Sequence, residues 1–507
     1  MTASNPQPRR LLQAIVFATS LLAAAPTAAQ PAAESAAIQE RPTSGGLLSL
    51  LPPDSVTEHE IGNGDARLAY MATAGTFALR DQHGERMAAI FYTAYTLKGA
   101  NAATRPVTFV FNGGPGAASA YLHLGLVGPR IAAFGSRPDA AAMQLQANPD
   151  SWLRFTDLVL IDPVGTGWSR AAIPDEAENF WSVERDAETL AKVIALYVAD
   201  NARTASPKYL LGESYGGFRA AKVARRLQRD QGLILSGIVM VAPFLEGALH
   251  FGTDRSALSA ALLLPAIAAT ELDRQDRFSA AALAAAERFA MTDYLVTLAG
   301  RPPAGAEAER FYGRVAELTG LPPDVVARTR GFVARAYLSH PRGDAPEIVS
   351  PYDGTFTLPD PFPESDDGHA GDPILDGYLQ SLGGLFVGYA RDQLNYTTEI
   401  TYELLNRRVS GRWNWDGGGR RGAGAGDDLR QQLALNPGMR LLIAHGRSDL
   451  VTPYGVSRYV LDHLPQEAGA GRASLALYKG GHMFYFDPAS RSAFTDDAEA
   501  FYQGTAP

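Results

Sequence analysis

The sequence contains no cysteine in its 507 residues. A chain without cysteine forms no disulfide bonds, so an apolar core must hold the fold, and a chain of this length can bury a large one. The lipobox-type cysteine that carries a lipid tether is missing as well. If the protein is exported, we therefore expect a soluble form rather than a lipid-anchored one.

The sequence also lacks an excess of positive charge. It has 45 lysines and arginines against 54 acidic residues, a net charge of −9, and no basic block outside its N-terminus. Nucleic acid is therefore an unsuitable partner. With 46% hydrophobic and 20% charged residues, the composition is that of a globular protein with more than one folding unit, or one large domain with an insertion.

Long hydrophobic runs are missing apart from one near the N-terminus. There, Arg9 and Arg10 precede an apolar stretch of about 15 residues, shorter than the ~20 that a membrane anchor needs. Small residues then lead to Ala29, a suitable cleavage site. Residues 1–29 are therefore predicted to be a signal peptide, which leaves a periplasmic or secreted protein without a membrane span.

The next part of the chain alternates between short apolar runs and helical patterns. Residues 30–50 are rich in alanine, proline and serine and are predicted to be a flexible leader. Residues 187–200 have the apolar spacing of a helix. Alternating buried strands and helices predict a mainly parallel sheet with helices on both faces. The apolar runs are 107–112, 157–162, 208–211 and 237–244.

This rhythm breaks between residues 246 and 400, where alanine-rich helical runs and a proline- and aspartate-rich loop follow one another. We interpret this segment as a helical cap inserted into the core. Strand patterns return at 439–445 and 474–478, so residues 51–245 and 401–507 are predicted to be the two parts of one core. The glycine-rich stretch 416–428 is expected to be a mobile loop, because it lacks the lysine and hydroxyl of a phosphate-binding motif.

A candidate nucleophile lies between an apolar strand and an amphipathic helix. Ser214 is the centre of Gly212-Glu213-Ser214-Tyr215-Gly216, a Gly-x-Ser-x-Gly string. In this context the string is typical of a nucleophile elbow, in which small residues allow a strained turn that exposes the hydroxyl. The alternative is a serine that caps a helix in another α/β fold.

A serine nucleophile needs a base and an orienting acid, which follow it in the order acid, then histidine, in this class of fold. Asp449 comes a few residues after one late strand, and His482 follows the last strand on a glycine-rich loop. We predict these two as acid and base. His340 and His369 also follow Ser214, but they come before the strand patterns resume near residue 440. The rivals His445 and His463 are expected to be structural histidines, and Asp416 and the acids at 366–367 solvated loop charges.

The tetrahedral oxyanion needs hydrogen-bond donors as well. Glycines directly after the strand at 107–112 allow a backbone amide to approach the substrate, and Gly114 is the expected donor. The second donor would be the amide of Tyr215, the residue after the nucleophile. A plain turn is the alternative for this glycine string. The sequence contains no recognisable metal cluster or cofactor motif, so no cofactor is expected.

Taken together, the strings NGGPGAAS, LVGP, NPDSW, IDPVGTGWSR, GESYGG, HGRSDLVTP and GGHM resemble the serine carboxypeptidase family of α/β-hydrolases. The resemblance implies an α/β-hydrolase fold with a helical cap. It also implies that Asn112, Gly113 and Glu213 bind the free carboxylate at the C-terminus of a peptide substrate. A glutamate can do so only when it is protonated, because two carboxylates repel each other.

Three positions depart from the family pattern. Leu126 stands where the family usually has a second glutamate, and Val110 replaces a tryptophan. Ala117 stands where a disulfide cysteine is common, which affects stability rather than chemistry. Without a second glutamate to share its proton, Glu213 must rely on burial to raise its pKa. We therefore expect weaker C-terminal recognition, or recognition supplied by the cap, and a less pronounced acid optimum.

These observations favour an exported serine carboxypeptidase that works through an acyl-enzyme. An esterase or acyltransferase on the same scaffold is the alternative, since a triad serves any acyl group. A non-catalytic binding protein is a third hypothesis, against which the complete set of triad and oxyanion residues argues. The oligomeric state and the side-chain preference remain open at this stage.

Overall fold

The computed structural model describes residues 46–62, 67–133, 143–340, 347–364, 371–469 and 471–504. The predicted signal peptide (1–29) and residues 30–45 of the predicted leader lie outside this part of the chain. Within it, no helix combines the length and apolar character needed to cross a membrane.

A ten-stranded mixed sheet forms the centre of the fold, in the order β1-β2-β3-β7-β4-β9-β10-β13-β14, with β8 paired to β3. Six neighbouring strands, from β7 to β14, run parallel, and β1–β3 add an antiparallel edge. The strands are β1 (Ser55–Ile61), β2 (Leu68–Arg80), β3 (Arg86–Leu97), β4 (Val107–Phe111), β7 (Asp157–Ile161), β8 (Arg170–Ala171), β9 (Lys208–Glu213), β10 (Gly237–Val241), β13 (Arg440–Gly446) and β14 (Ala473–Tyr478).

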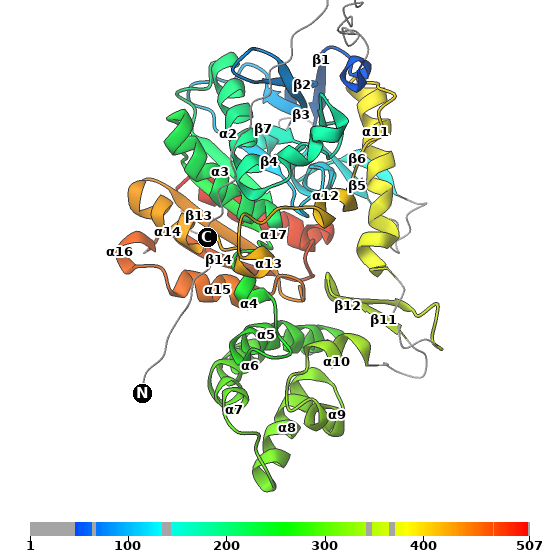
Figure 1. Cartoon of the computed structure of the whole chain (residues 1–507), viewed down its shortest axis with the longest axis vertical. Coiled ribbons are helices and arrows are strands. Elements are labelled where there is room, and N and C mark those ends of the chain that lie inside the picture. The colour runs from blue at the N-terminus through cyan, green and yellow to red at the C-terminus, as the bar shows by residue number, and fades with distance from the viewer. Residues whose placement is uncertain are drawn as a thin grey trace, which may run out of the picture. The chain divides into compact units, whose positions relative to one another are not determined.

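Both faces of this sheet are covered, as its apolar strands require. Successive side chains of a strand point to opposite faces, so Leu210 and Leu211 of β9 enter two different core clusters. One cluster includes α2 (Val183–Asp200) and α3 (Tyr215–Gln231), and the other includes α17 (Pro488–Tyr502). The chain therefore has an α/β-hydrolase fold, and the predicted fold class is confirmed (Figure 1).

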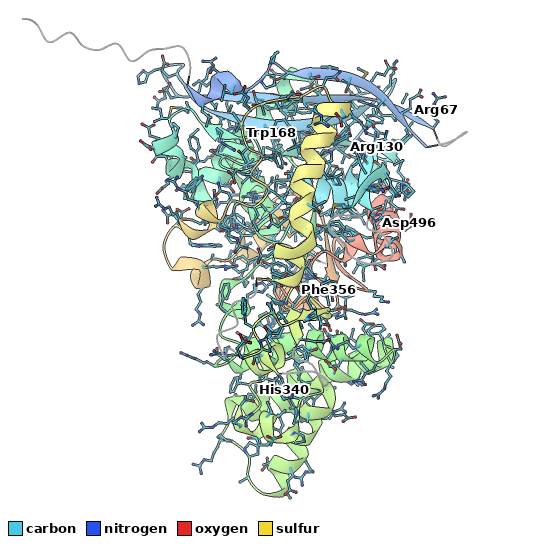
Figure 2. The ribbon with its side chains drawn as sticks, turned by 90° about the vertical axis from the view of Figure 1, so that its right-hand side faces the viewer. Arg67, Arg130, Trp168, His340, Phe356 and Asp496 are labelled. Atoms are coloured by element: carbon cyan, nitrogen blue, oxygen red, sulfur yellow. The ribbon has the colours of Figure 1, made fainter. Side chains whose placement is uncertain are left out.

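Between β10 and β13 the chain leaves the sheet. Helices α5 (Ala257–Arg274), α6 (Ala280–Phe289), α8 (Ala306–Thr319) and α10 (Ala334–Ser339) lie together, shown in green at the lower end of Figure 1. Helix α11 (Ser381–Gln393) returns toward the sheet, where Phe386 packs 5.7 Å from Trp168 between ring centroids. Figure 2 shows Trp168 beside this helix. The predicted domain boundaries at 245 and 400 stay predictions.

Two segments expected to be loops contain secondary structure. Strands β11 (Glu347–Ser350) and β12 (Asp353–Pro359) form a hairpin within the proline- and aspartate-rich stretch. The glycine-rich stretch contains α13 (Gly419–Gly422) and the start of α14 (Gly426–Leu435). Both were missed because proline and glycine oppose regular structure locally, whereas here contacts with distant residues stabilise it.

Candidate active site

Ser214 lies at the sharp turn between β9 and α3, with a positive φ of 59°. Such a conformation is strained for a residue with a side chain, and the turn needs small neighbours. A Cβ on Gly212 would lie 2.0 Å from the carbonyl oxygen of Gly216, and one on Gly216 would lie 2.6 Å from that of Phe111. The two glycines of the motif are therefore required by backbone packing, as in a nucleophile elbow.

Asp449 and His482 come together on the loops after β13 and β14. His482 Nδ1 donates a hydrogen bond to Asp449 Oδ2 over 2.8 Å, which leaves Nε2 free to accept a proton. Thr452 supports the pair: its hydroxyl donates to the same oxygen over 2.7 Å, and its amide donates to Asp449 Oδ1 over 3.0 Å. Sequence reasoning did not single out Thr452, although it is three residues after Asp449.

Opposite charge sets the protonation of this buried pair. Burial acts to raise the pKa of Asp449, but His482 and the hydrogen bonds outweigh it, so the net shift is downward and the carboxylate is ionised. Burial acts to lower the pKa of His482, but Asp449 outweighs it, so the net shift is upward. The histidine is therefore a stronger base than a free imidazole.

The rival histidines have other surroundings. His445 is fully buried against Ser457, and burial lowers its pKa to about 4. His463 caps the end of α15 (Tyr454–Asp462) and bonds to the Tyr459 carbonyl. Figure 2 shows His340 among the green helices at the far end from the sheet.

Of the rival acids, the structure describes Asp416. Asp416 accepts a hydrogen bond from the Glu184 amide over 2.6 Å at the N-terminus of α2. His369 and the acids at 366–367 lie outside the described residues.

The two predicted oxyanion donors lie on adjoining backbone segments. A Cβ on Gly113 would be 2.5 Å from the Tyr215 amide nitrogen, so the loop after β4 packs directly on the elbow. Gly114 follows with φ +96°, a conformation that favours glycine. Among the described residues, neither the Gly114 amide nor the Tyr215 amide has a hydrogen-bond partner. Both N–H groups are thus available to a developing oxyanion.

Asn112 and Glu213 lie side by side because Phe111 of β4 pairs with Gly212 of β9. The Asn112 side-chain amide donates to Glu213 Oε2. The Tyr485 hydroxyl donates to the same carboxyl group, 2.9 Å from Oε1 and 3.0 Å from Oε2. The register of two parallel strands therefore builds a buried carboxyl site beside the elbow.

Tyr485 is the residue that sequence reasoning missed at this carboxyl site. It lies three residues after His482, and its ring occupies the space above Gly125, where a Cβ would be 2.5 Å from Tyr485 Cε2. Leu126, next to Gly125, is fully buried in the apolar core. A hydroxyl from the C-terminal part of the chain thus bonds to Glu213, whose usual second glutamate is absent.

Burial raises the pKa of Glu213 to about 7. His482 and the bonds from Tyr485 and Asn112 act in the opposite direction, because they favour the charged form, and Asp449 adds to the increase. Near neutral pH the group is thus about half protonated. This agrees with the expectation that burial would have to raise the pKa of Glu213.

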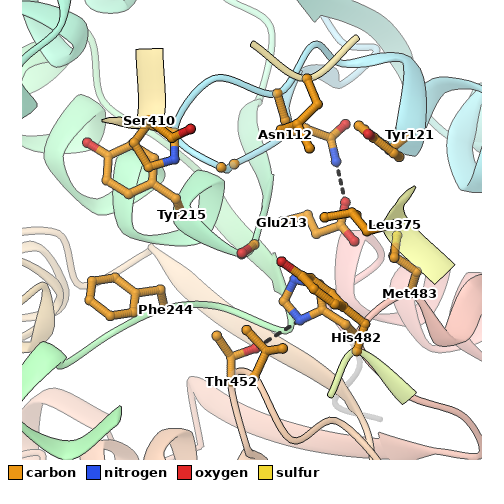
Figure 3. Close-up of a pocket in the computed structure, with 18 of the residues that line it drawn as sticks. Asn112, Tyr121, Glu213, Tyr215, Phe244, Leu375, Ser410, Thr452, His482 and Met483 are labelled. Atoms are coloured by element: carbon orange, nitrogen blue, oxygen red, sulfur yellow. Dashed lines mark hydrogen bonds between the residues drawn. The ribbon is translucent and has the colours of Figure 1, made fainter. Parts of the chain in front are cut away.

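Ser214, His482 and Glu213 line one pocket of about 400 Å³, a size suited to a small molecule or a short peptide end. Figure 3 shows Glu213 above His482, Thr452 below it and Phe244 to its left. The catalytic roles of Ser214, Asp449 and His482 stay predictions, as do those of Asn112, Gly113, Gly114, Glu213 and Tyr215. All of these residues except Asp449 line the pocket, and Asp449 lies behind His482, to which it is hydrogen-bonded.

Comparison with known proteins finds a family match over part of the chain. Residues 69–258 match the serine carboxypeptidase family. Over 150 residues the chain is 31% identical to the pheromone-processing carboxypeptidase of Yarrowia lipolytica. The matched segment covers 29% of this chain and 23% of that protein. The fold is similar to the crystal structure of a prohormone-processing carboxypeptidase from Saccharomyces cerevisiae, with a TM-score of 0.54, 14% identity, and 90% and 95% of the two chains covered.

The family match contains the loop after β4 and the elbow, with Asn112, Gly114 and Ser214. Asp449 and His482 lie beyond its end. Asp449 and His482 come close to the matched segment only in the folded structure.

Proposed function

We propose that the chain, whose residues 69–258 match the serine carboxypeptidase family, is a member of that family and removes C-terminal residues from peptides. The observation that carries the proposal is the common pocket of Ser214, His482 and the buried Glu213 carboxyl group. Ser214 and His482 suit acyl transfer. When Glu213 is protonated, it suits recognition of a free C-terminal carboxylate.

In the proposed mechanism, His482 accepts the hydroxyl proton of Ser214 as the oxygen attacks the scissile carbonyl carbon. The Gly114 and Tyr215 amides donate to the oxyanion, and Asp449 stabilises the imidazolium. When the intermediate collapses, His482 gives its proton to the leaving amine, and the C-terminal residue departs. Water, deprotonated by His482, then attacks the acyl-enzyme and regenerates Ser214.

The leaving residue would bind at the carboxyl site. Protonated Glu213 can donate to its carboxylate, and Asn112 orients Glu213. The hydroxyl of Tyr121 lines the same pocket, is buried, and has no partner among the described residues, so it is a further candidate donor. Peptide C-termini are thus the substrate class that this site suits.

Digestion of a peptide library, read by mass spectrometry, tests the proposal. The wild-type protein should shorten peptides one residue at a time from the C-terminus, and Ser214→Ala should lower that rate by at least about 10³-fold because the nucleophile is lost. Internal cleavage, or equal activity in Ser214→Ala, would contradict it. Blocking the C-terminus as an amide should slow the reaction.

An esterase or acyltransferase is the second candidate, and Leu126 is the observation that favours it. Without a second glutamate, the carboxyl site has one acid and two neutral donors, which weakens the case for strict peptide specificity. Turnover of acyl esters with none of peptides would decide for this candidate.

We also propose that the protein is exported, because the N-terminal segment has the three parts of a signal peptide. N-terminal sequencing of the mature protein should begin at Gln30. A mature chain that still carries Arg9 and Arg10 would contradict export by this route.

A further inference from the structure

The glycine-rich stretch 416–428 places Arg420 at the wall of the pocket. Arg420, on α13, lines the same cavity as Ser214. Its guanidinium carbon lies 4.7 Å from the ring centroid of Phe251, 5.8 Å from that of Phe244 and 5.9 Å from that of Trp415. These three rings also line the pocket. We refer to Arg420 with Phe244, Phe251 and Trp415 as the aromatic wall.

Backbone contacts hold this arginine in position. The Gly247 amide donates to the Ala423 carbonyl over 2.8 Å, and the Ala425 amide donates to the Leu245 carbonyl over 2.8 Å. A Cβ on Gly247 would lie 2.1 Å from the Arg420 carbonyl oxygen, so only glycine allows this approach. Although it was expected to be a mobile loop, the stretch is bonded on its C-terminal side to the chain after β10.

Within the part of the chain that the structure describes, the charge of Arg420 has no partner. Among the described residues, no carboxylate lies within ion-pair distance of it and no side-chain hydrogen bond reaches it. The pocket's other arginine, Arg407, is already paired with Asp376. His250, next to the rings, is neutral because burial lowers its pKa to about 3. Aromatic faces attract a guanidinium but leave its in-plane N–H donors unused.

The position of the wall identifies the part of the substrate that meets it. In Figure 3, Glu213 lies above His482, whereas Phe244 lies to its left, at a distance from Glu213. The Tyr215 ring, on the residue that supplies an oxyanion amide, lies 5.5 Å from Trp415. If the leaving C-terminal residue binds at Glu213, the residue before the scissile bond must extend toward the aromatic wall.

We propose that the aromatic wall selects an acidic residue, glutamate or aspartate, immediately before the scissile bond. The inference rests on the proposed carboxypeptidase function. A guanidinium offers a carboxylate two parallel N–H···O bonds, and the rings offer apolar surface to the side-chain methylenes. A lysine at the same position would meet an unpaired positive charge and would be disfavoured.

The test uses N-blocked dipeptides with phenylalanine at the C-terminus and glutamate, glutamine or lysine before it. The kcat/KM of the wild-type protein should be about tenfold higher for the glutamate peptide than for the glutamine peptide, and lowest for the lysine peptide. A tenfold effect is in the range expected of a charged pair that is partly exposed. Arg420→Met should bring the glutamate-to-glutamine ratio close to one. Arg420→Glu should reverse the order in favour of lysine.

The matched control is Arg421→Met. Arg421 is the next residue, but its guanidinium lies beside Gly252, and it is not among the pocket-lining residues. It should keep the ratio of the wild-type protein. High salt should reduce the glutamate-to-glutamine ratio of kcat/KM in the wild-type protein and in Arg421→Met, because salt screens an exposed ion pair.

The outcomes separate this inference from the function on which it rests. Equal rates on the glutamate and glutamine peptides, or a ratio that persists in Arg420→Met, overturn the inference while the carboxypeptidase function stands. Failure to cleave any of the three peptides counts against the function. In that case, calorimetric binding of the same peptides to Ser214→Ala decides: an Arg420-dependent preference for glutamate supports the inference, and equal binding overturns it.

Discussion

At the scale of single residues, Glu213 combines the features that set this site apart. The family resemblance implies a pair of glutamates that share a proton, but here Leu126 removes one of them. Instead, the Tyr485 hydroxyl donates a hydrogen bond to Glu213. A phenol can donate a hydrogen bond to a carboxylate but does not give up its proton near neutral pH. Burial is therefore the main cause that keeps Glu213 protonated.

This predicts a pH dependence that differs between substrates. Below about pH 7 Glu213 is mostly protonated and can bind a free carboxylate, and above it the ionised form repels that carboxylate. For free-acid peptides, kcat/KM should therefore fall above about pH 7. Peptide amides should lack this fall. For both substrates the rate should decrease at acid pH, where His482 becomes protonated.

Tyr485→Phe gives the sharper form of this prediction. Removing a donor that favours the charged form should raise the pKa of Glu213. The fall of kcat/KM at alkaline pH should then move to higher pH, by up to about one unit. The measurement is kcat/KM against pH for an acid and amide pair of peptides. A maximum below about pH 5, or an unchanged limb in the variant, would show that Glu213 does not control the profile.

At the scale of elements, the strand–turn–helix unit around Ser214 depends on backbone packing. Arg219 of α3 donates to the Asn112 carbonyl and to Asp186 of α2, the latter over 2.6 Å. Its guanidinium also lies 5.0 Å from the Tyr215 ring centroid. One buried arginine thus connects the elbow, the carboxyl site and the neighbouring helix.

A pair of glycine substitutions tests this packing. Gly216→Ala would push a methyl group to 2.6 Å from the Phe111 carbonyl oxygen and should cost about 1–3 kcal/mol of stability as overpacking. It should also slow labelling of Ser214 by a fluorophosphonate. In α8, a Cβ on Gly313 meets nothing within 4 Å, so Gly313→Ala should stabilise the protein by about 0.5–1 kcal/mol. Urea unfolding measures both, and equal effects would contradict the prediction.

At the scale of the whole described chain, the segment between β10 and β13 contacts the loops that carry Asp449 and His482. The His482 amide donates to the Tyr352 carbonyl over 2.6 Å. Arg447, two residues before Asp449, forms a two-pronged ion pair with Asp273 of α5, over 2.7 and 2.5 Å. Its guanidinium lies 3.4 Å from the Phe278 ring centroid. The position of the loops that carry Asp449 and His482 therefore depends on the segment between β10 and β13.

Arg447→Met should disturb both stability and catalysis. It leaves the mostly buried Asp273 carboxylate unpaired, which should cost about 3 kcal/mol, and kcat should fall because the Asp449 loop loses its support. In the double variant Arg447→Met with Asp273→Leu, most of the lost stability should return, because no carboxylate is left unpaired. The lost kcat should not return. The control Arg185→Met removes an exposed helix pair and should change neither quantity. Urea unfolding and kcat are the measurements, and unchanged kcat in Arg447→Met would contradict the coupling.

The sequence alone determined the features that local pattern and chain order encode. Apolar runs identified the parallel strands, because buried strands need apolar side chains on both faces. The glycines around Ser214 indicated the elbow, and Asp449 and His482 were selected because they follow the last two strands. The structure brings these two residues into contact, whereas their catalytic roles await the experiments above.

Only the tertiary structure decided which distant side chains complete the site. Tyr485 reaches Glu213 across 272 positions of the chain, and Arg420 reaches the pocket because glycine at 247 lets two backbones touch. The hairpin β11–β12 likewise forms where proline and aspartate suggested a loop. Side-chain contacts of this kind have no local pattern in the sequence, because they depend on how separate loops meet at the carboxyl edge of the sheet.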